Sequence, residues 1–184
     1  TIFTILREQK PESKIACIYE WGGIQPLIDH KIHDFEKAIR PSDIASASCE
    51  YIKAEKPDLM AIIYDDPDHV GHSKGHDSPE YHAKMEELDA YLGEIIAAVK
   101  EAGIYDDSII IVTSDHGGIE TDHGGFDLNE METPFIIAGK NVKKGGEFKE
   151  SMMQYDVAAT IAEIFALATP QVWTAKSMSH VFVD

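Results

Sequence analysis

Two short stretches of this sequence combine carboxylates and imidazoles at spacings that suit metal binding. The first, DDPDHVGHSKGH, covers residues 65–76, and the second, SDHGGIETDHGG, covers residues 114–125. Six of the nine histidines fall between His69 and His123, most of them in these stretches. Imidazole nitrogens together with carboxylate oxygens suit zinc, manganese or iron, whereas calcium favours all-oxygen sites. The two stretches are therefore the candidate functional segments.

The first stretch offers one pair of candidate ligands. Asp68 and His72 lie four residues apart on either side of Gly71. A loop with a glycine at that point can fold both side chains onto one ion. His123, seven positions after His116 in the second stretch, can return to this ion or to a neighbouring one.

The second stretch offers another pair. Asp115 and His116 are adjacent, so they share an ion only if the chain turns sharply, and the Gly-Gly pair that follows allows such a turn. With the three residues above, the candidates number five, too many for one catalytic zinc with an open position but suitable for two metals. A Ser-His-Asp triad built from Ser114, Asp115 and His116 is rejected, because consecutive residues cannot align as nucleophile, base and orienting group. Taken alone, either Asp-His-Gly copy also fits an ordinary turn.

The remaining histidines are assigned roles outside metal ligation. His69 and His76 are expected to be loop residues or to hydrogen-bond the ligands instead of the ion. A surface or capping role is expected for the other four, His30, His33, His82 and His180. The histidines that matter for chemistry are thus confined to the two candidate segments.

Alternating helices and strands must position these segments. Helices are predicted over residues 1–9, 41–56, 78–103 and 156–166, and strands over residues 14–20, 59–64, 108–113 and 134–139. Strands that are apolar throughout are typical of a parallel sheet covered on both faces. In open sheets of this kind, ligands bind outside the carboxyl ends of the strands. The candidate segments begin at two such ends, after residues 64 and 113, so we expect them to meet in space.

Composition limits the remaining choices. A chain of 184 residues with 43% hydrophobic and 27% charged residues suits one globular domain. No apolar run approaches the roughly 18 residues that span a bilayer, and no leader pattern opens the chain. The net charge of −17 disfavours binding to nucleic acid and repels anionic substrates unless cations occupy the site. Cys17 and Cys49 are too few for a disulfide framework, and Cys17 is expected in the core.

An ordered set of motifs between residues 58 and 165 resembles the alkaline phosphatase superfamily, in particular its type I phosphodiesterase/nucleotide pyrophosphatase branch. These motifs are DPDHVGHSKG, DAYLGEIIAAVKEAG, IIIVTSDHGG, DHGG, ETPFIIAGKNVKKG and YDVAATIAEIF. The opening residues TIFTILREQKPESKIACIYEWGG are similar to the middle of bacterial members. The resemblance implies a three-layer α/β/α sandwich with a mostly parallel sheet. It makes residues 1–184 a single domain, the C-terminal portion of an alkaline phosphatase-like catalytic domain.

The resemblance also implies a site with two divalent metal ions, commonly zinc, with manganese as the alternative. Asp68 and His72 would bind one ion together with His123, and Asp115 and His116 would bind the other. A Ser or Thr nucleophile and a further metal-binding Asp are expected upstream of residue 1. No catalytic nucleophile is therefore assigned within this chain, which alone is expected to show little or no hydrolase activity.

The leading hypothesis is a metal-dependent phosphoester hydrolase of the phosphodiesterase/nucleotide pyrophosphatase or alkaline phosphatase type. We expect a small phosphate ester as substrate, no nucleic acid polymer as partner, and a periplasmic or extracytoplasmic location with the signal peptide upstream. Sulfatase, phosphonate hydrolase and phosphotransferase chemistries share the scaffold and stay open. Two other classes also stay open, a non-catalytic metal-binding module and a flavodoxin-like nucleotide-binding domain. The second of these lacks a Gly-rich phosphate loop after its first strand.

Overall fold

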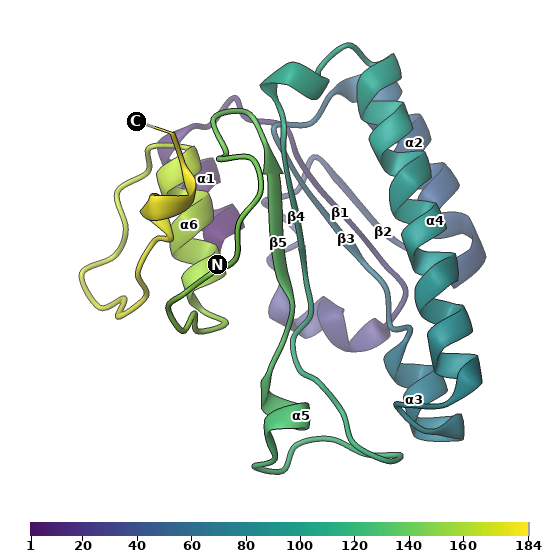
Figure 1. Ribbon diagram of the computed structural model, residues 1–184. Helices are drawn as coiled ribbons and strands as arrows, with labels where there is room; N and C mark the ends of the chain where they lie inside the picture. Colours follow the sequence, from purple (N-terminus) through teal and green to yellow (C-terminus); the bar gives the residue numbers. More distant parts are fainter. Residues whose placement is uncertain (184) are drawn as a thin grey trace.

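Three parallel strands form the sheet that leads into the first candidate segment. The computed structural model, which describes residues 1–183, places them in the order β2-β1-β3 (Figure 1). Their bounds are β1 Ile15–Tyr19, β2 Phe35–Ala38 and β3 Leu59–Ile63. In the middle strand, Cys17 lies opposite both Glu36 and Ala61, and every residue of β1 is buried. The run IACIY therefore occupies the central position that its continuous apolar character indicates.

The other two strands form a separate antiparallel pair. β4 Ile109–Thr113 pairs with β5 Phe135–Gly139, so that Ile111 lies opposite Ile137. No backbone hydrogen bond joins β4 to β3 within residues 1–183. The expectation that the run at 108–113 would extend the parallel sheet is therefore wrong in its pairing, because its hydrogen-bonded neighbour is the antiparallel β5. β3 and most of β4 are only half-buried despite their apolar sequences.

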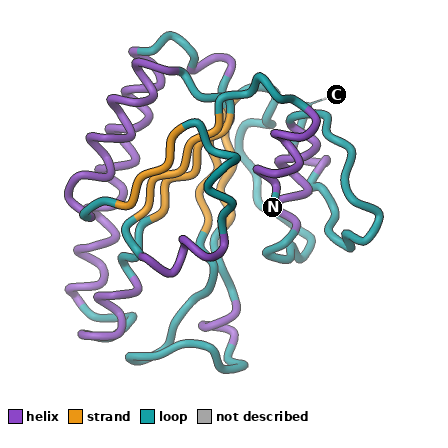
Figure 2. The backbone as a smooth tube through the Cα atoms, turned by 180° about the vertical axis from the view of Figure 1, so that it is seen from behind, coloured by secondary structure: helices purple, strands orange, loops and turns teal. Residues whose placement is uncertain are grey.

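Helices cover both faces of the three-stranded sheet, which confirms the layered α/β class. Consecutive side chains of a strand point to opposite faces. Accordingly, Leu59 packs against a cluster from α1 and α6, whereas Met60 packs against a cluster from α2 and α4. The helices run over α1 Ile2–Gln9, α2 Pro41–Glu55, α4 Pro79–Glu101 and α6 Asp156–Ile164. Both views show the two helix pairs on opposite sides of the strands (Figures 1 and 2).

The longest helix, α4, begins and ends at residues suited to those places. The Ser78 hydroxyl accepts the Tyr81 N–H at 3.1 Å, and Pro79 occupies the first turn, where its missing N–H costs nothing. Gly103, at φ +72°, follows the last turn. The short elements are α3 Asp68–Lys74, α5 Leu128–Met131 and the 3-10 turns Gly22–Leu27, Tyr105–Asp107 and Ser179–Val181. No helix among residues 1–183 is both long and apolar enough to cross a bilayer.

Three features differ from the sequence-based expectations. β2 was not predicted, because four residues with the mixed sequence FEKA carry no apolar run, and pairing with β1 is what makes them a strand. The segment after β3, expected as a loop, contains the helix α3. His33, expected at the surface, has a side chain that is only 1% exposed and lies against the Phe3 ring.

Candidate metal centre

The helix α3 sets the geometry of the first ligand pair. Residues four apart in a helix lie on the same face. Asp68 and His72 are so placed, and His72 Nε2 lies 3.2 Å from Asp68 Oδ2. The spacing predicts a loop folded at Gly71, but the pair forms on a helical turn instead.

His123 joins this pair from the other candidate segment. Its Nε2 lies 3.8 Å from Asp68 Oδ1, and its ring centroid is 4.9 Å from that of His72. One ligand atom from each of Asp68, His72 and His123 lies within 4.8 Å of the others. The three side chains are 29–42% exposed, so solvent and a ligand can reach them. The structure thus brings together the three residues expected at the first metal.

A tight turn holds the two segments against each other. Ile119 and Asp122 exchange two backbone hydrogen bonds of 3.0 Å, and Glu120 between them adopts a left-handed conformation at φ +51°. The carbonyl oxygen of Thr121 in this turn accepts a hydrogen bond from His72 Nδ1 at 2.8 Å. The turn at residues 119–122 therefore supplies the carbonyl oxygen that orients His72 of α3.

The Thr121 contact also decides which ring nitrogen of His72 carries a proton. A carbonyl oxygen only accepts, so Nδ1 is the donor and the lone pair of the neutral ring sits on Nε2. Nε2 faces the Asp68 carboxylate, which is also an acceptor, and the contact is favourable only with a cation between them or a proton on Nε2. In agreement, the hydrogen bond to Thr121 and the negative charge of Asp68 raise the pKa of His72. The donor set therefore fits a divalent metal that replaces this proton.

The second predicted pair lies beside the first group. The His116 ring stacks on that of His123 with centroids 3.8 Å apart, and His116 Nδ1 donates to the Gly117 carbonyl at 2.8 Å. As for His72, this bond leaves the lone pair on Nε2. The Asp115 Oδ2 atom is 3.6 Å from His116 Nε2, and the Asp115 side chain is 86% exposed. Asp115 and His116 thus offer two adjacent metal-ligand atoms. Among the described residues, they belong to no group of three ligand atoms that lie within 4.8 Å of one another.

Close backbone packing fixes the turn that carries Asp115 and His116. The Gly117 N–H donates to the Glu130 carbonyl at 2.8 Å, and a Cβ on Gly117 would overlap the backbone of Asn129 and come within 3.0 Å of the Glu132 carbonyl. Only glycine fits there. The neighbouring Ser114 hydroxyl donates to the His116 carbonyl at 3.0 Å, and this bond gives no support to a nucleophile–imidazole pair.

Two carboxylates near the site were not singled out from the sequence. Glu20, the first residue after β1, accepts the backbone N–H groups of Asp65 and Asp66, the latter at 3.3 Å. Its position after a buried strand was the signal that could have identified it. Burial raises the pKa of Asp65, and the nearby Asp68 charge raises it further. The concentration of acidic groups at this edge favours a bound cation.

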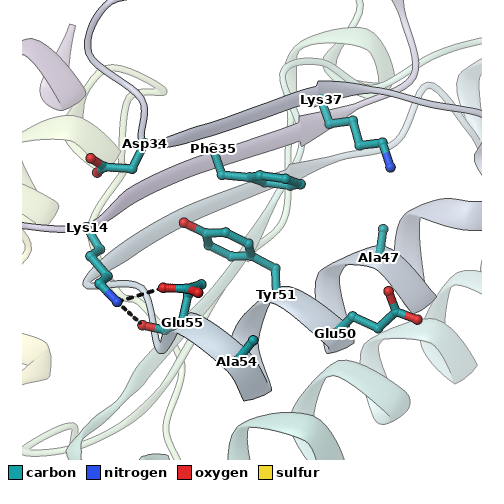
Figure 3. Close-up of a pocket in the computed structure, with 9 residues that line it drawn as sticks. All are labelled: Lys14, Asp34, Phe35, Lys37, Ala47, Glu50, Tyr51, Ala54 and Glu55. Carbon is teal, nitrogen blue, oxygen red and sulfur yellow. Dashed lines mark hydrogen bonds and ion pairs between the residues drawn. The ribbon is translucent and has the colours of Figure 1, made fainter.

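The surface also has a hollow outside this cluster. It occupies about 600 Å³ beside β2 and α2 (Figure 3). There Phe35 stacks on Tyr51 with ring centroids 4.3 Å apart, and Lys14 Nζ pairs with Glu55 at 2.8 Å. The charged groups at this end of the hollow are thus paired with each other, and the hollow contains none of the candidate ligands.

The fold is of the layered α/β class, and the family match and the relatives of the chain place it in the alkaline phosphatase superfamily. Within it, the chain belongs to the family described as type I phosphodiesterase / nucleotide pyrophosphatase, which matches residues 14–164. The relatives in this superfamily are phosphoesterases, sulfatases and mutases, and the family is metal-dependent.

Curated relatives agree with this placement, and a solved structure shares the fold. The chain is 26% identical over 157 residues to a 2,3-bisphosphoglycerate-independent phosphoglycerate mutase of Natronomonas pharaonis, covering 82% of this chain and 29% of the mutase. It is 32% identical over 120 residues to the human GPI ethanolamine phosphate transferase 2 catalytic subunit, covering 62% and 12%. A 2-O GAG sulfatase structure, 12% identical, superposes with a TM-score of 0.77 over 98% of this chain and 56% of the sulfatase. The chain therefore spans only part of the length of its relatives.

Proposed function

We propose that this chain forms part of the active site of a metal-dependent phosphoester hydrolase that uses two divalent metal ions. The observation that carries the proposal is the convergence of Asp68, His72 and His123 within 4.8 Å, with His72 Nε2 left as a lone-pair donor by its Thr121 contact. Family membership supports the same chemistry.

The residues divide between two positions. Asp68, His72 and His123 would hold one ion, and Asp115 and His116 would supply two ligands of the second. When bound, two dications, most simply zinc, would polarise the phosphoester and stabilise the charge that develops on its oxygens. The protein's own contribution is to fix imidazole tautomers through backbone carbonyls and to hold Asp68 beside them. Bound cations would also offset the repulsion of an anionic substrate by a chain of net charge −17.

The nucleophile of the proposed reaction is a Ser or Thr hydroxyl supplied from outside residues 1–184. The proposal has two supports: the relatives extend well beyond this chain, and the hydroxyl of Ser114, the serine of the second segment, donates to a carbonyl. We further propose that the same outside sequence completes the ligands around Asp115 and His116, and that the whole protein acts in an extracytoplasmic compartment.

The test compares the full-length gene product with its His72→Ala variant on a phosphate monoester, a phosphodiester and an aryl sulfate, with zinc or manganese added. We expect phosphoester hydrolysis that is abolished by chelation and by the substitution. Hydrolysis of the sulfate alone would identify a sulfatase instead, and transfer of phosphate to an acceptor alcohol would identify a transferase. Activity of His72→Ala at the wild-type rate would refute the site.

A further inference from the structure

We propose that His76 is a positioning residue that holds the Asp68 carboxylate in its metal-binding orientation by donating a hydrogen bond from Nε2. This inference rests on the proposed metal site. His76 Nε2 lies 3.2 Å from Asp68 Oδ1, on a side chain that is only 5% exposed. A carboxylate accepts hydrogen bonds and a buried polar atom requires a partner, so the contact is an Nε2–H···Oδ1 bond.

Two glycines create the space for this imidazole. A Cβ added to Gly71, inside α3, would overlap the His76 ring, and so would a Cβ added to Gly118, in the loop after β4. The ring is thus enclosed between the two segments that carry the metal-ligand candidates. A side chain at either glycine would displace the imidazole and, with it, the Asp68 contact.

The same turn that orients His72 also anchors His76. The Glu120 carbonyl accepts the His76 backbone N–H at 2.7 Å, and His76 Nδ1 is 3.2 Å from the same oxygen. Both ring nitrogens therefore face acceptors at 3.2 Å, and a neutral imidazole donates from only one of them. The Asp68 carboxylate is a stronger acceptor than a carbonyl that already accepts a 2.7 Å bond, so we place the proton on Nε2.

His76 is not itself one of the clustered ligands. The group whose ligand atoms lie within 4.8 Å of one another consists of Asp68, His72 and His123 and does not include His76. His76 binds Oδ1, whereas Oδ2 lies 3.2 Å from His72 Nε2, so one oxygen is held by His76 and the other faces a ligand nitrogen. Hydrogen bonds to a ligating carboxylate fix its orientation, and losing such a partner typically weakens metal binding about 10–100-fold.

The experiment measures Zn²⁺ affinity by competition with a chelator, and the visible absorption of bound Co²⁺, for residues 1–184 and three variants. His76→Gln places an amide N–H near the position of Nε2, His76→Asn reaches only the position of Nδ1, and His76→Met fills similar space without a donor. His82→Ala, which removes an exposed imidazole on α4, is the control. Circular dichroism verifies the fold of each variant.

We expect His76→Gln to retain the wild-type affinity and Co²⁺ spectrum, and His76→Asn and His76→Met to bind about 10–100-fold more weakly. Equal loss in all three variants would overturn the proposal, because the imidazole would then be a ligand or a packing group. Wild-type affinity in all three would overturn it as well. Absence of Zn²⁺ and Co²⁺ binding by the wild-type chain would instead refute the proposed metal site.

Discussion

Removal of the His72 imidazole tests the metal site directly. The substitution His72→Ala takes away one of three ligand atoms that lie within 4.8 Å of each other and leaves Asp68 and His123. Loss of a group that only orients a ligand costs about 10–100-fold in affinity, so loss of the ligand itself should cost about 100-fold or more. The control is His82→Ala, which removes an imidazole that contacts Asp77 outside the cluster.

The pH dependence of binding gives an independent measure of the same residue. The pKa of His72 is raised, first by its hydrogen bond to the Thr121 carbonyl and then by Asp68. A raised pKa means that the proton stays on Nε2 to higher pH, and the metal must displace it. Below the pKa of His72, zinc affinity should therefore fall as the pH decreases, by about tenfold per pH unit for each displaced proton.

Zinc affinity is measured by titration against a competing chelator between about pH 5 and pH 8, the range in which histidines titrate. In His72→Ala the slope of affinity against pH should be smaller by about one proton, whereas His82→Ala should keep the wild-type slope. Equal zinc affinity in His72→Ala and the wild type, or an equal decrease in both variants, would refute the assignment of His72 as a ligand.

Three further measurements test the packing and pairing of the fold. Gly117→Ala should lower the melting temperature and weaken zinc binding, because the added Cβ overlaps the Asn129 backbone. Gly93→Ala, on α4 with open space around the added Cβ, should stabilise the fold by about 0.5–1 kcal/mol. Equal effects of the two substitutions would contradict the close packing at Gly117. The pKa of Asp34 is lowered by hydrogen bonds from the Ile15 N–H and Arg7, against the opposing effect of partial burial. The ionised Asp34 should therefore stabilise the fold, and this stabilisation should be lost as the pH falls below the ordinary value of 3.8. In thermal melts at acid pH, Asp34→Asn should lack this loss of stability. In hydrogen-exchange measurements, β1, paired on both sides, should exchange slowly, whereas amides on the unpaired edges of β3 and β4 should exchange quickly; uniform protection would show that the two sheets are joined.

Strong local signals made much of the fold predictable. The apolar run at Ile15–Tyr19 becomes the buried central strand, because a segment without polar side chains is stable only when covered on both faces. The Ser78-Pro79 start of α4 is equally local, since a hydroxyl cap and a proline satisfy requirements of the first helical turn. β2 escaped prediction because its conformation depends on hydrogen bonds to β1 and not on its own composition.

The candidate site divides in the same way. Residue types and spacing singled out five candidates, because carboxylates and imidazoles that follow two strands of one domain meet at its edge: Asp68, His72, Asp115, His116 and His123. The family resemblance, and not the spacing, implied that His123 joins Asp68 and His72, which the structure brings together. The metal roles of all five candidates remain predictions. The position of His76 between Gly71 and Gly118 was beyond the reach of the sequence, because those glycines come from different segments and meet only in the folded chain.

The candidate ligand residues, the central strand and the long helices could be predicted from the sequence, since each follows from residue types and their spacing along the chain. The antiparallel partner of β4, the burial of His76 and the proton position on His72 follow only from the folded chain. Those three depend on backbone groups brought from distant segments, such as the Thr121 carbonyl that faces His72 across 49 positions of sequence. Hydrogen bonds of that kind leave no pattern in the sequence of either partner.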